Sequence, residues 1–306
     1  MSESENVKRV LVVGDVMVDR YFYVGSTRQA PEAPIPVWDK IEHENRLGGA
    51  ANVAHNLKAL GGEDIEVFLA GIVENEAKKM IGKIGINTIL CAGFDTMYKD
   101  RYVDKNTMKI VFRCDNIKEF HRQSLETFEL SLRHFLEGHQ FDAVIFSDYN
   151  KGSIGKNIVD LVSPHAKLKV VDSKRLDLSI YRGMDILKVN EMEYGSQGSC
   201  SAYPYVEGLF EHVVVTKGAK GAELRQAEKG QEVAQEGVVN LKYVVHSENF
   251  PSISVQAKDV TGCGDTHTAA MTFSLLKNSD VRMAVKFANE CARNVVQKFG
   301  TSVVSK

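Results

Sequence analysis

Long apolar runs are absent from this sequence of 306 residues. A membrane-spanning helix needs about 20 consecutive apolar residues, and no stretch of the chain reaches that length. The first ten residues, MSESENVKRV, are polar and acidic, and they lack the apolar core of a signal peptide. We therefore expect no membrane partner and a cytoplasmic location.

An excess of charge of one sign is also absent. The chain has 38 Lys and Arg residues against 40 Asp and Glu residues, which gives a formal net charge of −2 at pH 7. Nucleic acids attract proteins that carry an excess of positive charge. The sequence therefore predicts no nucleic-acid partner.

Cysteine is scarce and scattered. The five cysteines stand far apart, at 91, 114, 200, 263 and 291, with no C-x-x-C pair. Their spacing matches no metal site, and their number is odd, so a disulfide framework is not indicated. Reduced thiols are the plain interpretation.

Proline is rare as well, but three of the six prolines fall within residues 30–36. Pro31, Pro34 and Pro36 exclude a helix there and suit an edge strand or an extended loop. Residues 18–46 are otherwise aromatic and β-branched, and residues 86–113 form a second β-rich block. We predict that these two segments form a small β-sheet lid over a site.

The rest of the chain alternates short apolar runs with helical patterns. Predicted strands cover 8–13, 65–70, 142–146, 168–171, 185–189 and 212–215. Predicted helices begin near 50 and cover roughly 74–83, 123–137, 265–277 and 280–298. Residues 228–257 look irregular, with short β segments at 239–245 and 253–257. This alternation predicts an α/β fold, a mostly parallel sheet with helices on both faces, and the absence of linkers predicts one domain over 1–306.

Polar residues follow several predicted strands. They are Asp15, Asp148, Asp172, Asn190 with Glu193, and Lys217. In open α/β sheets ligands bind at the carboxyl ends of the strands. Gly14 is not part of a G-x-G-x-x-G fingerprint, so a dinucleotide-binding fold is excluded.

A glycine-rich turn opens the helix predicted over 265–277. Gly262, Cys263 and Gly264 precede Asp265, and apolar residues then recur at helical spacing. The free N–H groups and the dipole of a helix start bind anions, and an adjacent carboxylate can take a proton from a hydroxyl. Such a pair suits phosphoryl transfer to an alcohol. The alternative is an ordinary turn with Asp265 as a helix cap.

Four motifs decide between these interpretations. They are Gly48-Gly49-Ala-Ala-Asn52, Asn190-Glu-Met-Glu193, Val215-Thr-Lys-Gly-Ala-Lys-Gly221 and Asp259-Val-Thr-Gly-Cys-Gly-Asp265. In this order they resemble the motifs of the ribokinase-like (PfkB-type) sugar kinases, over nearly the whole chain. The resemblance implies a ribokinase-like fold and ATP as the phosphate donor.

One subgroup of that family is most similar, the bacterial heptose 7-phosphate kinases. The similar stretches include Gly14-Asp-Val-Met-Val-Asp-Arg-Tyr21, Pro31-Glu-Ala-Pro-Ile-Pro36 and Ser147-Asp-Tyr-Asn-Lys-Gly152. The resemblance implies phosphorylation of the anomeric hydroxyl of D-glycero-D-manno-heptose 7-phosphate, in lipopolysaccharide precursor synthesis. Because the chain stops at Lys306, where the kinase domain of that subgroup ends, we expect the stand-alone kinase form.

The family assigns a role to each motif residue. Asp265 would be the general base, with Gly262, Cys263 and Gly264 around the anion hole. The sugar would contact Asp15, Asp19, Gly48, Gly49, Asn52 and Asp148. ATP would contact Asn190, Glu193, Thr216, Lys217, Gly218, Lys220, Gly221 and Asn289. A helix cap or turn residue is the alternative for several of these positions.

Two cations and one anion complete the expected site. Asn190 and Glu193 would hold Mg²⁺ through its water shell. Asp259, Thr261 and Gly300 resemble the monovalent-cation site of the family, for K⁺. The phosphate of a phosphorylated sugar needs cationic partners. The candidates are Arg28, Arg46, Lys109, Arg113 and Lys174, with solvated surface charge as the alternative for each.

The sequence departs from the family pattern in places. Val260 and Cys263 replace the usual Thr and Ala of the catalytic signature, and residues 86–122 match poorly. The helix start beside Cys263 could lower its thiol pKa, whereas His267 has no visible partner and is interpreted as structural. Another sugar or nucleoside kinase, or a silent sugar-binding homologue, stays an alternative. Unpaired lid edges predict a homodimer through the lid.

Overall fold

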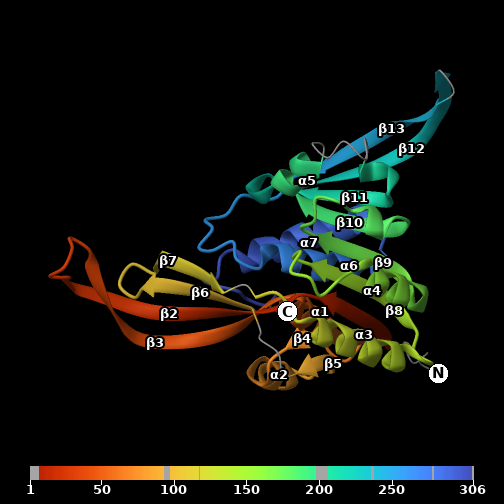
Figure 1. The fold of residues 1–306 in the computed structure, drawn as a ribbon. Coiled ribbons are helices and arrows are strands. Elements are labelled where there is room, and N and C mark those ends of the chain that lie inside the picture. The colour runs from red at the N-terminus through yellow and green to blue at the C-terminus, as the bar shows by residue number, and fades with distance from the viewer. Residues whose placement is uncertain are drawn as a thin grey trace, which may run out of the picture.

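The computed structural model describes residues 7–92, 97–116, 118–197, 206–235, 238–277 and 279–304. Within these residues the main sheet has nine strands, in the order β13-β12-β11-β10-β9-β8-β1-β4-β5 (Figure 1). The strands from β5 to β11 pair in parallel, and β12 and β13 add an antiparallel hairpin. The predicted α/β fold class is therefore confirmed.

The strands of the main sheet have the following bounds: β1 Lys8–Gly14, β4 Ile65–Val73, β5 Asn87–Ala92, β8 Phe141–Asp148, β9 Ala166–Ser173, β10 Met184–Asn190, β11 Phe210–Thr216, β12 Ala222–Gln235 and β13 Val238–Phe250. The helices are α1 Ala50–Gly61, α2 Asn75–Gly82, α3 Arg122–Leu136, α4 Lys156–Val162, α5 Glu191–Gln197, α6 Cys263–Leu276 and α7 Val281–Val295. Short 3-10 helices cover Ser163–His165, Ser179–Tyr181, Val206–Gly208 and Gly218–Lys220.

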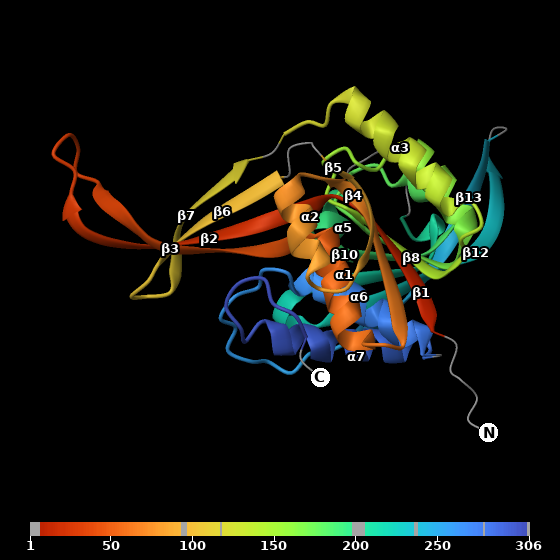
Figure 2. The same cartoon turned by 90° about the horizontal axis from the view of Figure 1, so that it is seen from below.

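Helices cover both faces of the main sheet (Figures 1 and 2). Successive residues of a strand point to opposite faces, so Val10 and Val12 of β1 join the core under α1, α6 and α7. Leu11 and Val13 join the second core, under α3 and α4. All four side chains are fully buried. A strand that is buried on both faces has a continuous apolar sequence, and for this reason β1 could be predicted from the sequence.

A second, four-stranded sheet projects from the body as the lid (Figure 2). Its strands are β2 Val16–Gln29, β3 Pro36–Gly49, β6 Met97–Asp104 and β7 Lys109–Asn116, in the order β3-β2-β6-β7. One face of the lid carries Arg20 with Asp100 and a stack of Phe22 on Tyr102. Because side chains alternate along each strand, the neighbouring residues Asp19 and Arg101 lie on the other face.

Two expectations are corrected. The segment 86–113 is not all lid, because β5 pairs with β4 in the main sheet and only β6 and β7 join the small sheet. Residues 228–257 are not irregular up to Phe250, because β12 and β13 form a long hairpin that extends from the body (Figure 1). No strand forms over 253–257, which is an extended loop.

Among the residues that the structure describes, no helix is both long enough and apolar enough to cross a membrane.

Candidate active site

Helix α6 begins at the glycine-rich turn. Gly262, the residue before the helix, has a φ of +81°, in the left-handed region. A Cβ at this position would lie 2.8 Å from Asn52 Nδ2, so both the conformation and the space require glycine. No side chain in the described part of the chain caps the helix. Its first N–H groups and its dipole are therefore placed to bind an anion.

Asp265 lies in the first turn of α6 and is 5% exposed. Asn52 Nδ2 donates a hydrogen bond to Asp265 Oδ2 at 2.8 Å, and the hydroxyl of Tyr149 donates one to Oδ1. Burial raises the pKa of the Asp265 carboxyl, and the two hydrogen bonds act in the opposite direction. The structure thus brings the predicted base beside the helix start and Asn52. Tyr149 was not assigned a role from the sequence, although it lies within the quoted stretch Ser147–Gly152.

Asp19 lies on the face of the lid that is turned toward the site. It is 4% exposed, and its Oδ1 accepts a hydrogen bond from Arg101 at 2.9 Å. Thr301 Oγ1 donates to Asp19 Oδ2 at 3.0 Å. A Cβ on Gly48 would lie 2.6 Å from Asp19 Oδ2, so glycine allows the strands to approach here. Gly49 adopts φ of +57° and begins α1 just ahead of Asn52.

Two predicted sugar ligands are instead occupied within the protein. The carboxylate of Asp15 is fully buried and accepts bonds from the N–H groups of Tyr149 and Lys151 at 2.8 and 3.0 Å. Ser153 Oγ donates to its other oxygen at 2.6 Å. The polar residues at these strand ends therefore hold a loop of the protein in place, and a sugar contact from Asp15 is not supported.

Asp148 is also fully buried, and Tyr181 donates its hydroxyl to Asp148 Oδ2 at 2.6 Å. The guanidinium of Arg175 donates to the same oxygen. Asp148 Oδ1 accepts the N–H of Asn150 at 2.8 Å. The prediction that Asp148 binds substrate is not supported for the same reason.

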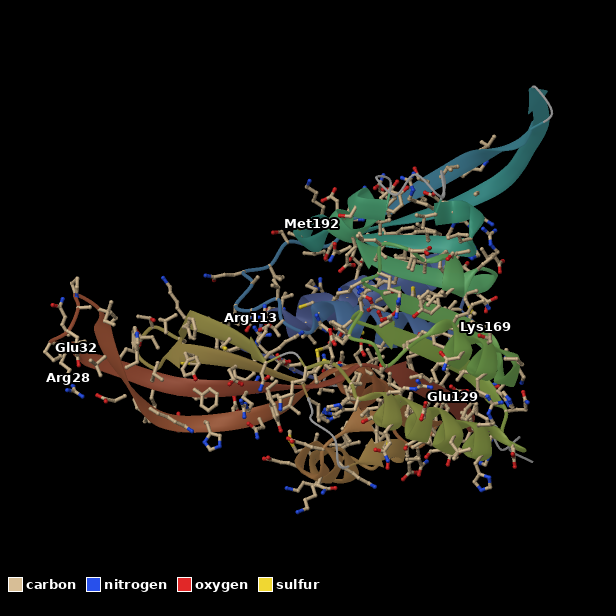
Figure 3. All side chains as sticks on the ribbon, viewed as in Figure 1. Arg28, Glu32, Arg113, Glu129, Lys169 and Met192 are labelled. Carbon is tan, nitrogen blue, oxygen red and sulfur yellow. The ribbon has the colours of Figure 1, made fainter. Side chains whose placement is uncertain are left out.

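The predicted phosphate anchors do not converge. Arg28 lies at the far end of the lid, whereas Arg113 lies near the body (Figure 3). Arg46 donates to the carbonyls of Phe299 and Thr301 at 2.6 and 3.1 Å, and it therefore ties the lid to the C-terminal segment.

The other two candidates are also apart from Arg113. Lys109 is exposed at the start of β7. Lys174 forms an ion pair with Glu193 at 2.5 Å. Arg28, Arg46 and Lys109 are thus corrected, because where a strand residue lies in the lid depends on pairing that the sequence does not display. Lys174 lies near the site, 5.1 Å from the centre of the Tyr149 ring, but is paired with Glu193.

A different group of cations does converge on the site. Lys99 and Arg101 of β6 lie on the same lid face as Asp19, because they alternate with Asp100 and Tyr102 of the opposite face. Arg113 of β7 lies directly across from Arg101 in the strand register. The Lys99 ammonium lies 5.0 Å from the centre of the Tyr149 ring. Burial lowers the pKa of Lys99, while the negative charges of Asp19 and Asp265 raise it. Lys99, Arg101 and Arg113 therefore form a cationic cluster, here called the lid cations. Arg101 pairs with Asp19 and Arg113 with Asp115, whereas Lys99 lies within electrostatic reach of the predicted base.

A buried ion pair lies beneath the start of α6. Lys188 Nζ is 2.9 Å from Asp172 Oδ2, and their side chains are 4% and 3% exposed. A Cβ on Gly264 would lie 2.9 Å from Lys188 Nζ, so the ammonium packs against the first turn of the helix. Burial opposes ionisation of Asp172, but the charges of Lys188 and Lys174, together with the hydrogen bonds from Lys188 and Thr268, lower its pKa. Lys188 was missed from the sequence, although a lysine within the apolar strand at 185–189 was a signal.

Asn190 and Glu193 lie together at the start of α5. The N–H of Glu193 donates to Asn190 Oδ1, and the N–H of Asn190 donates to Glu193 Oε2, both at 2.8 Å. A carboxylate and an amide oxygen are suitable partners for the water shell of Mg²⁺. The residues present therefore fit the ion, with Lys174 as the neighbouring charge on Glu193.

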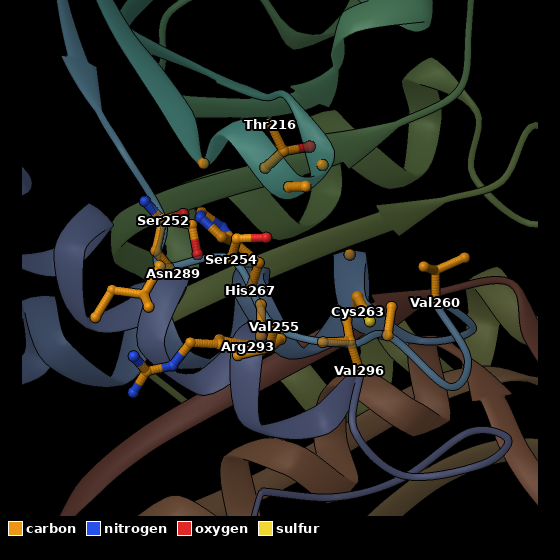
Figure 4. A pocket seen from close by; sticks show the side chains of 17 residues that line it. Thr216, Ser252, Ser254, Val255, Val260, Cys263, His267, Asn289, Arg293 and Val296 are labelled. Carbon is orange, nitrogen blue, oxygen red and sulfur yellow. The ribbon is translucent and has the colours of Figure 1, made fainter.

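A pocket of about 220 Å³ lies between α6, α7 and the turn after β11 (Figure 4). Thr216, Gly218, Gly221 and Asn289 line it, as expected for the nucleotide. Lys217 and Lys220 are not among its lining residues, and Lys217 pairs with Glu223 at 2.5 Å. The expectation that these two lysines line the nucleotide is therefore not supported.

Most of the remaining pocket wall was not found from the sequence. This part of the wall consists of residues from the loop 252–257 and of Val260, Ala292, Arg293 and Val296. His267 also lines the pocket and is 3% exposed. Its ring nitrogens have no hydrogen-bond partner by distance and angle in the described part of the chain, and burial lowers its pKa to about 3. His267 is thus a neutral polar wall residue rather than only a structural one.

Cys263 also lines this pocket, but the expected effect on its thiol is wrong. Burial, and then the charges of Asp259 and Asp265, raise the pKa of Cys263 to about 12. The partial positive charge of the helix start is thus outweighed by desolvation and by two neighbouring carboxylates.

Asp259, Thr261 and Gly300 lie together beside the glycine-rich turn. Asp259 Oδ1 accepts bonds from Thr261 N and Oγ1 at 2.9 and 2.7 Å. Gly300 N donates to Asp259 Oδ2 at 3.0 Å, so the C-terminal segment closes onto the turn. Carboxylate, hydroxyl and carbonyl oxygens are what K⁺ prefers, and this donor set fits the ion.

Comparison with known proteins gives the family. A model described as "pfkB family carbohydrate kinase" matches residues 7–306. The chain is 31% identical over 315 residues to "Bifunctional protein HldE" of Helicobacter pylori strain J99, which covers 98% of this chain and 65% of that protein. It is 33% identical over 320 residues to the HldE protein of Shewanella amazonensis, with 97% and 62% covered. The chain thus spans less than two thirds of the length of these relatives.

Solved structures share the fold at low sequence identity. A ribokinase from Thermotoga maritima superposes with a TM-score of 0.66 at 20% identity, over 95% of this chain and 94% of that chain. Phosphofructokinase-2 from Escherichia coli, described as a complex with potassium, superposes with a TM-score of 0.73 at 15% identity, over 98% and 96%.

The pair of Lys188 and Asp172 gives a stability prediction. Lys188→Met leaves a buried carboxylate without its cation, so the free energy of unfolding should fall by about 3–5 kcal/mol. Urea unfolding followed by circular dichroism measures this loss. The double variant Lys188→Met/Asp172→Leu removes both charges and should regain much of it. Equal stability of the single variant and the unchanged protein would contradict the assignment.

Proposed function

This chain belongs to the pfkB family of carbohydrate kinases, and from that premise we propose that its substrate is D-glycero-D-manno-heptose 7-phosphate. The family makes the chain an ATP-dependent phosphotransferase that acts on a sugar hydroxyl. The proposed reaction transfers the γ-phosphate of ATP to the anomeric hydroxyl and yields the 1,7-bisphosphate. It would supply heptose for lipopolysaccharide synthesis.

The observation that carries the proposal is the pairing of two sites. Asp265 is buried beside the open helix start, and Lys99 of the lid cations lies within electrostatic reach of it. A sugar bound there would have its reacting hydroxyl at this base, and Lys99, which has no ion pair among the described residues, would be within reach of an anionic substituent. A phosphate substituent needs such a partner, whereas an unphosphorylated sugar does not. The identity of 31–33% to HldE proteins gives independent support.

In this proposal Asp265 accepts the proton of the sugar hydroxyl as its oxygen attacks the γ-phosphorus. Asn52 and Asp19 hold sugar hydroxyls, and Gly48 allows the backbone to approach the sugar. The N–H groups at the start of α6 stabilise charge on the transferred phosphoryl oxygens. Lys188 lies directly against that turn and adds a positive charge.

The donor side uses the pocket described above. ATP would lie along Thr216, Gly218 and Gly221, with the base toward Asn289 and His267. Asn190 and Glu193 would hold Mg²⁺ through water. When bound, Mg²⁺ neutralises charge on the phosphate oxygens.

The lid also has surfaces for a second copy of the chain. Strands β3 and β7 are the edges of the small sheet, and Ile41, Ile110 and Phe112 on them are exposed. Open sheet edges with exposed apolar side chains favour pairing between copies. We infer a homodimer formed through the lids.

A coupled assay of ADP release, with ATP and Mg²⁺, tests the function. The sugars are heptose 7-phosphate, ribose, fructose, fructose 6-phosphate and a nucleoside. We expect turnover with the 7-phosphorylated heptose and little with the unphosphorylated sugars. Turnover with an unphosphorylated sugar alone would leave a kinase and discard the heptose proposal. No turnover with any sugar would favour a silent sugar-binding homologue.

The lid cations give a second prediction. Lys99→Met should lower kcat/KM for the phosphorylated sugar by about 10- to 100-fold, because a hydrogen bond to a charged group contributes about 1.5–3 kcal/mol. The KM for ATP should not change. Lys40→Met is the matched control, since Lys40 lies over Phe22 on the other face of the lid. If the Lys99 and Lys40 variants have equal kcat/KM for the phosphorylated sugar, Lys99 does not bind the sugar phosphate.

The oxygen cluster of Asp259, Thr261 and Gly300 gives a third prediction. Turnover should fall when K⁺ is replaced by a larger organic cation such as tetramethylammonium at equal ionic strength. Asp259→Asn should remove the difference between the two buffers. Equal rates of the unchanged protein in both buffers would exclude a role for K⁺.

A further inference from the structure

The catalytic base has a second hydrogen-bond donor that no part of the proposed mechanism uses. Tyr149 donates its hydroxyl to Asp265 Oδ1, while Asn52 Nδ2 donates to Oδ2. Each carboxylate oxygen therefore accepts one hydrogen bond from the protein and keeps a further lone pair. The two donors come from segments far apart in the chain, the loop after β8 and helix α1.

The loop that carries Tyr149 is held by buried carboxylates. Asp15 accepts the N–H of Tyr149 at 2.8 Å and the N–H of Lys151 at 3.0 Å, and it is fully buried. Asp148 accepts the N–H of Asn150, which has a φ of +56°, in the left-handed region. A non-glycine residue in this region and two buried carboxylates are unfavourable features that the surrounding structure has to offset. Their common effect is to fix the backbone at Tyr149.

The ring of Tyr149 is held as well. The ammonium of Lys99, from the lid, lies 5.0 Å from the ring centre, and that of Lys174, from the segment after β9, lies 5.1 Å from it. Cations near an aromatic ring are attracted by its electrons. The direction of the hydroxyl is therefore set by contacts to both the sugar side and the magnesium side of the site.

We propose that Tyr149 is a positioning residue for the catalytic base: its hydroxyl, fixed by the loop that Asp15 holds, orients the Asp265 carboxylate and favours its ionised form. The inference rests on the proposed role of Asp265. In the step, the sugar O–H bond breaks and its proton goes to Asp265. The sugar oxygen bonds to the γ-phosphorus, and the bond from phosphorus to the bridging oxygen breaks to release ADP.

The electrostatics agree with this geometry. Burial, and then the charge of Asp265, raise the pKa of Tyr149 well above its ordinary value, so the hydroxyl stays a donor at neutral pH. A donor to the ionised carboxylate lowers the pKa of that carboxyl, and its removal should raise it. The other charged or titratable groups around Asp265 are Asp19, Lys99, Asp172, Lys174, Lys188 and Cys263.

The test is the pH profile of Tyr149→Phe, which keeps the ring between the two lysines. We expect kcat to fall by about 10- to 100-fold, the effect of losing one hydrogen bond to a charged group. The acid limb of kcat should move to higher pH by about one unit, because a base with a raised pKa loses its charge earlier as the pH falls. The KM for ATP should stay the same.

Tyr23→Phe is the matched control. Tyr23 donates its hydroxyl to Glu44 at 2.8 Å in the lid, so this variant removes a tyrosine–carboxylate bond away from the base. Its kcat and its acid limb should match those of the unchanged protein. An equal change in both variants would mean a general effect of hydroxyl loss and would overturn the inference.

Two further measurements make the outcome decisive. Near-normal turnover of Asp265→Asn would show that Asp265 is not the base. An inactive Asp265→Asn, together with a Tyr149→Phe variant whose kcat and acid limb are unchanged, would overturn only the role of Tyr149. A higher kcat in Tyr149→Phe would mean that the bond restrains the base, which would also overturn it. If Tyr149→Phe fails to fold, difluorotyrosine at position 149 serves instead: a stronger donor should move the acid limb to lower pH, and no movement would contradict the proposal.

Discussion

The burial of one carboxylate, that of Asp265, is the constraint on which the site depends. An ionised carboxylate removed from water loses several kcal/mol of solvation unless it is hydrogen-bonded. Here the donors are Asn52 from α1 and Tyr149 from the loop after β8, and the carboxylate itself lies at the start of α6. Three segments more than 90 residues apart therefore have to meet at one edge of the sheet. A parallel sheet with all its carboxyl ends at that edge meets this requirement.

The other acidic residues of the site show how the rest of its charge is balanced. Asp172 has Lys188, and Asp19 has Arg101, both in buried ion pairs. Lys99 forms no ion pair with another described residue, although it lies within electrostatic reach of Asp19 and Asp265. A cation that is partly buried and not committed to one carboxylate is available to an anionic ligand. Arg101 is paired with Asp19 and Arg113 with Asp115, so Lys99 is the lid cation on which the proposal of a phosphorylated sugar mainly rests.

The sequence alone predicted the parts of the molecule that depend on local pattern. The apolar run of β1 and the glycine turn before Asp265 are such features, because burial on two faces and a left-handed Gly262 leave direct marks in the residue order. Prediction from the sequence failed for side-chain contacts that depend on how the strands and segments pair. Arg46 and Arg101 are both lid arginines, yet one binds carbonyls of the C-terminal segment and the other binds Asp19. Asp15 follows a strand end as a ligand would, but it holds backbone N–H groups. Strand β12 escaped notice because most of its residues are polar or charged, whereas part of β13 was predicted as the β segment 239–245.

Tyr149 brings these separate features together in one residue. Its backbone is fixed by Asp15, its ring contacts Lys99 of the lid and Lys174 beside Glu193, and its hydroxyl reaches Asp265. A shift of the lid moves Lys99, and a change at the magnesium side draws on Lys174, because that lysine pairs with Glu193. Either event changes the surroundings of the ring whose hydroxyl touches the base. In the proposed mechanism these direct contacts would link the orientation of Asp265 to both the sugar site and the magnesium site.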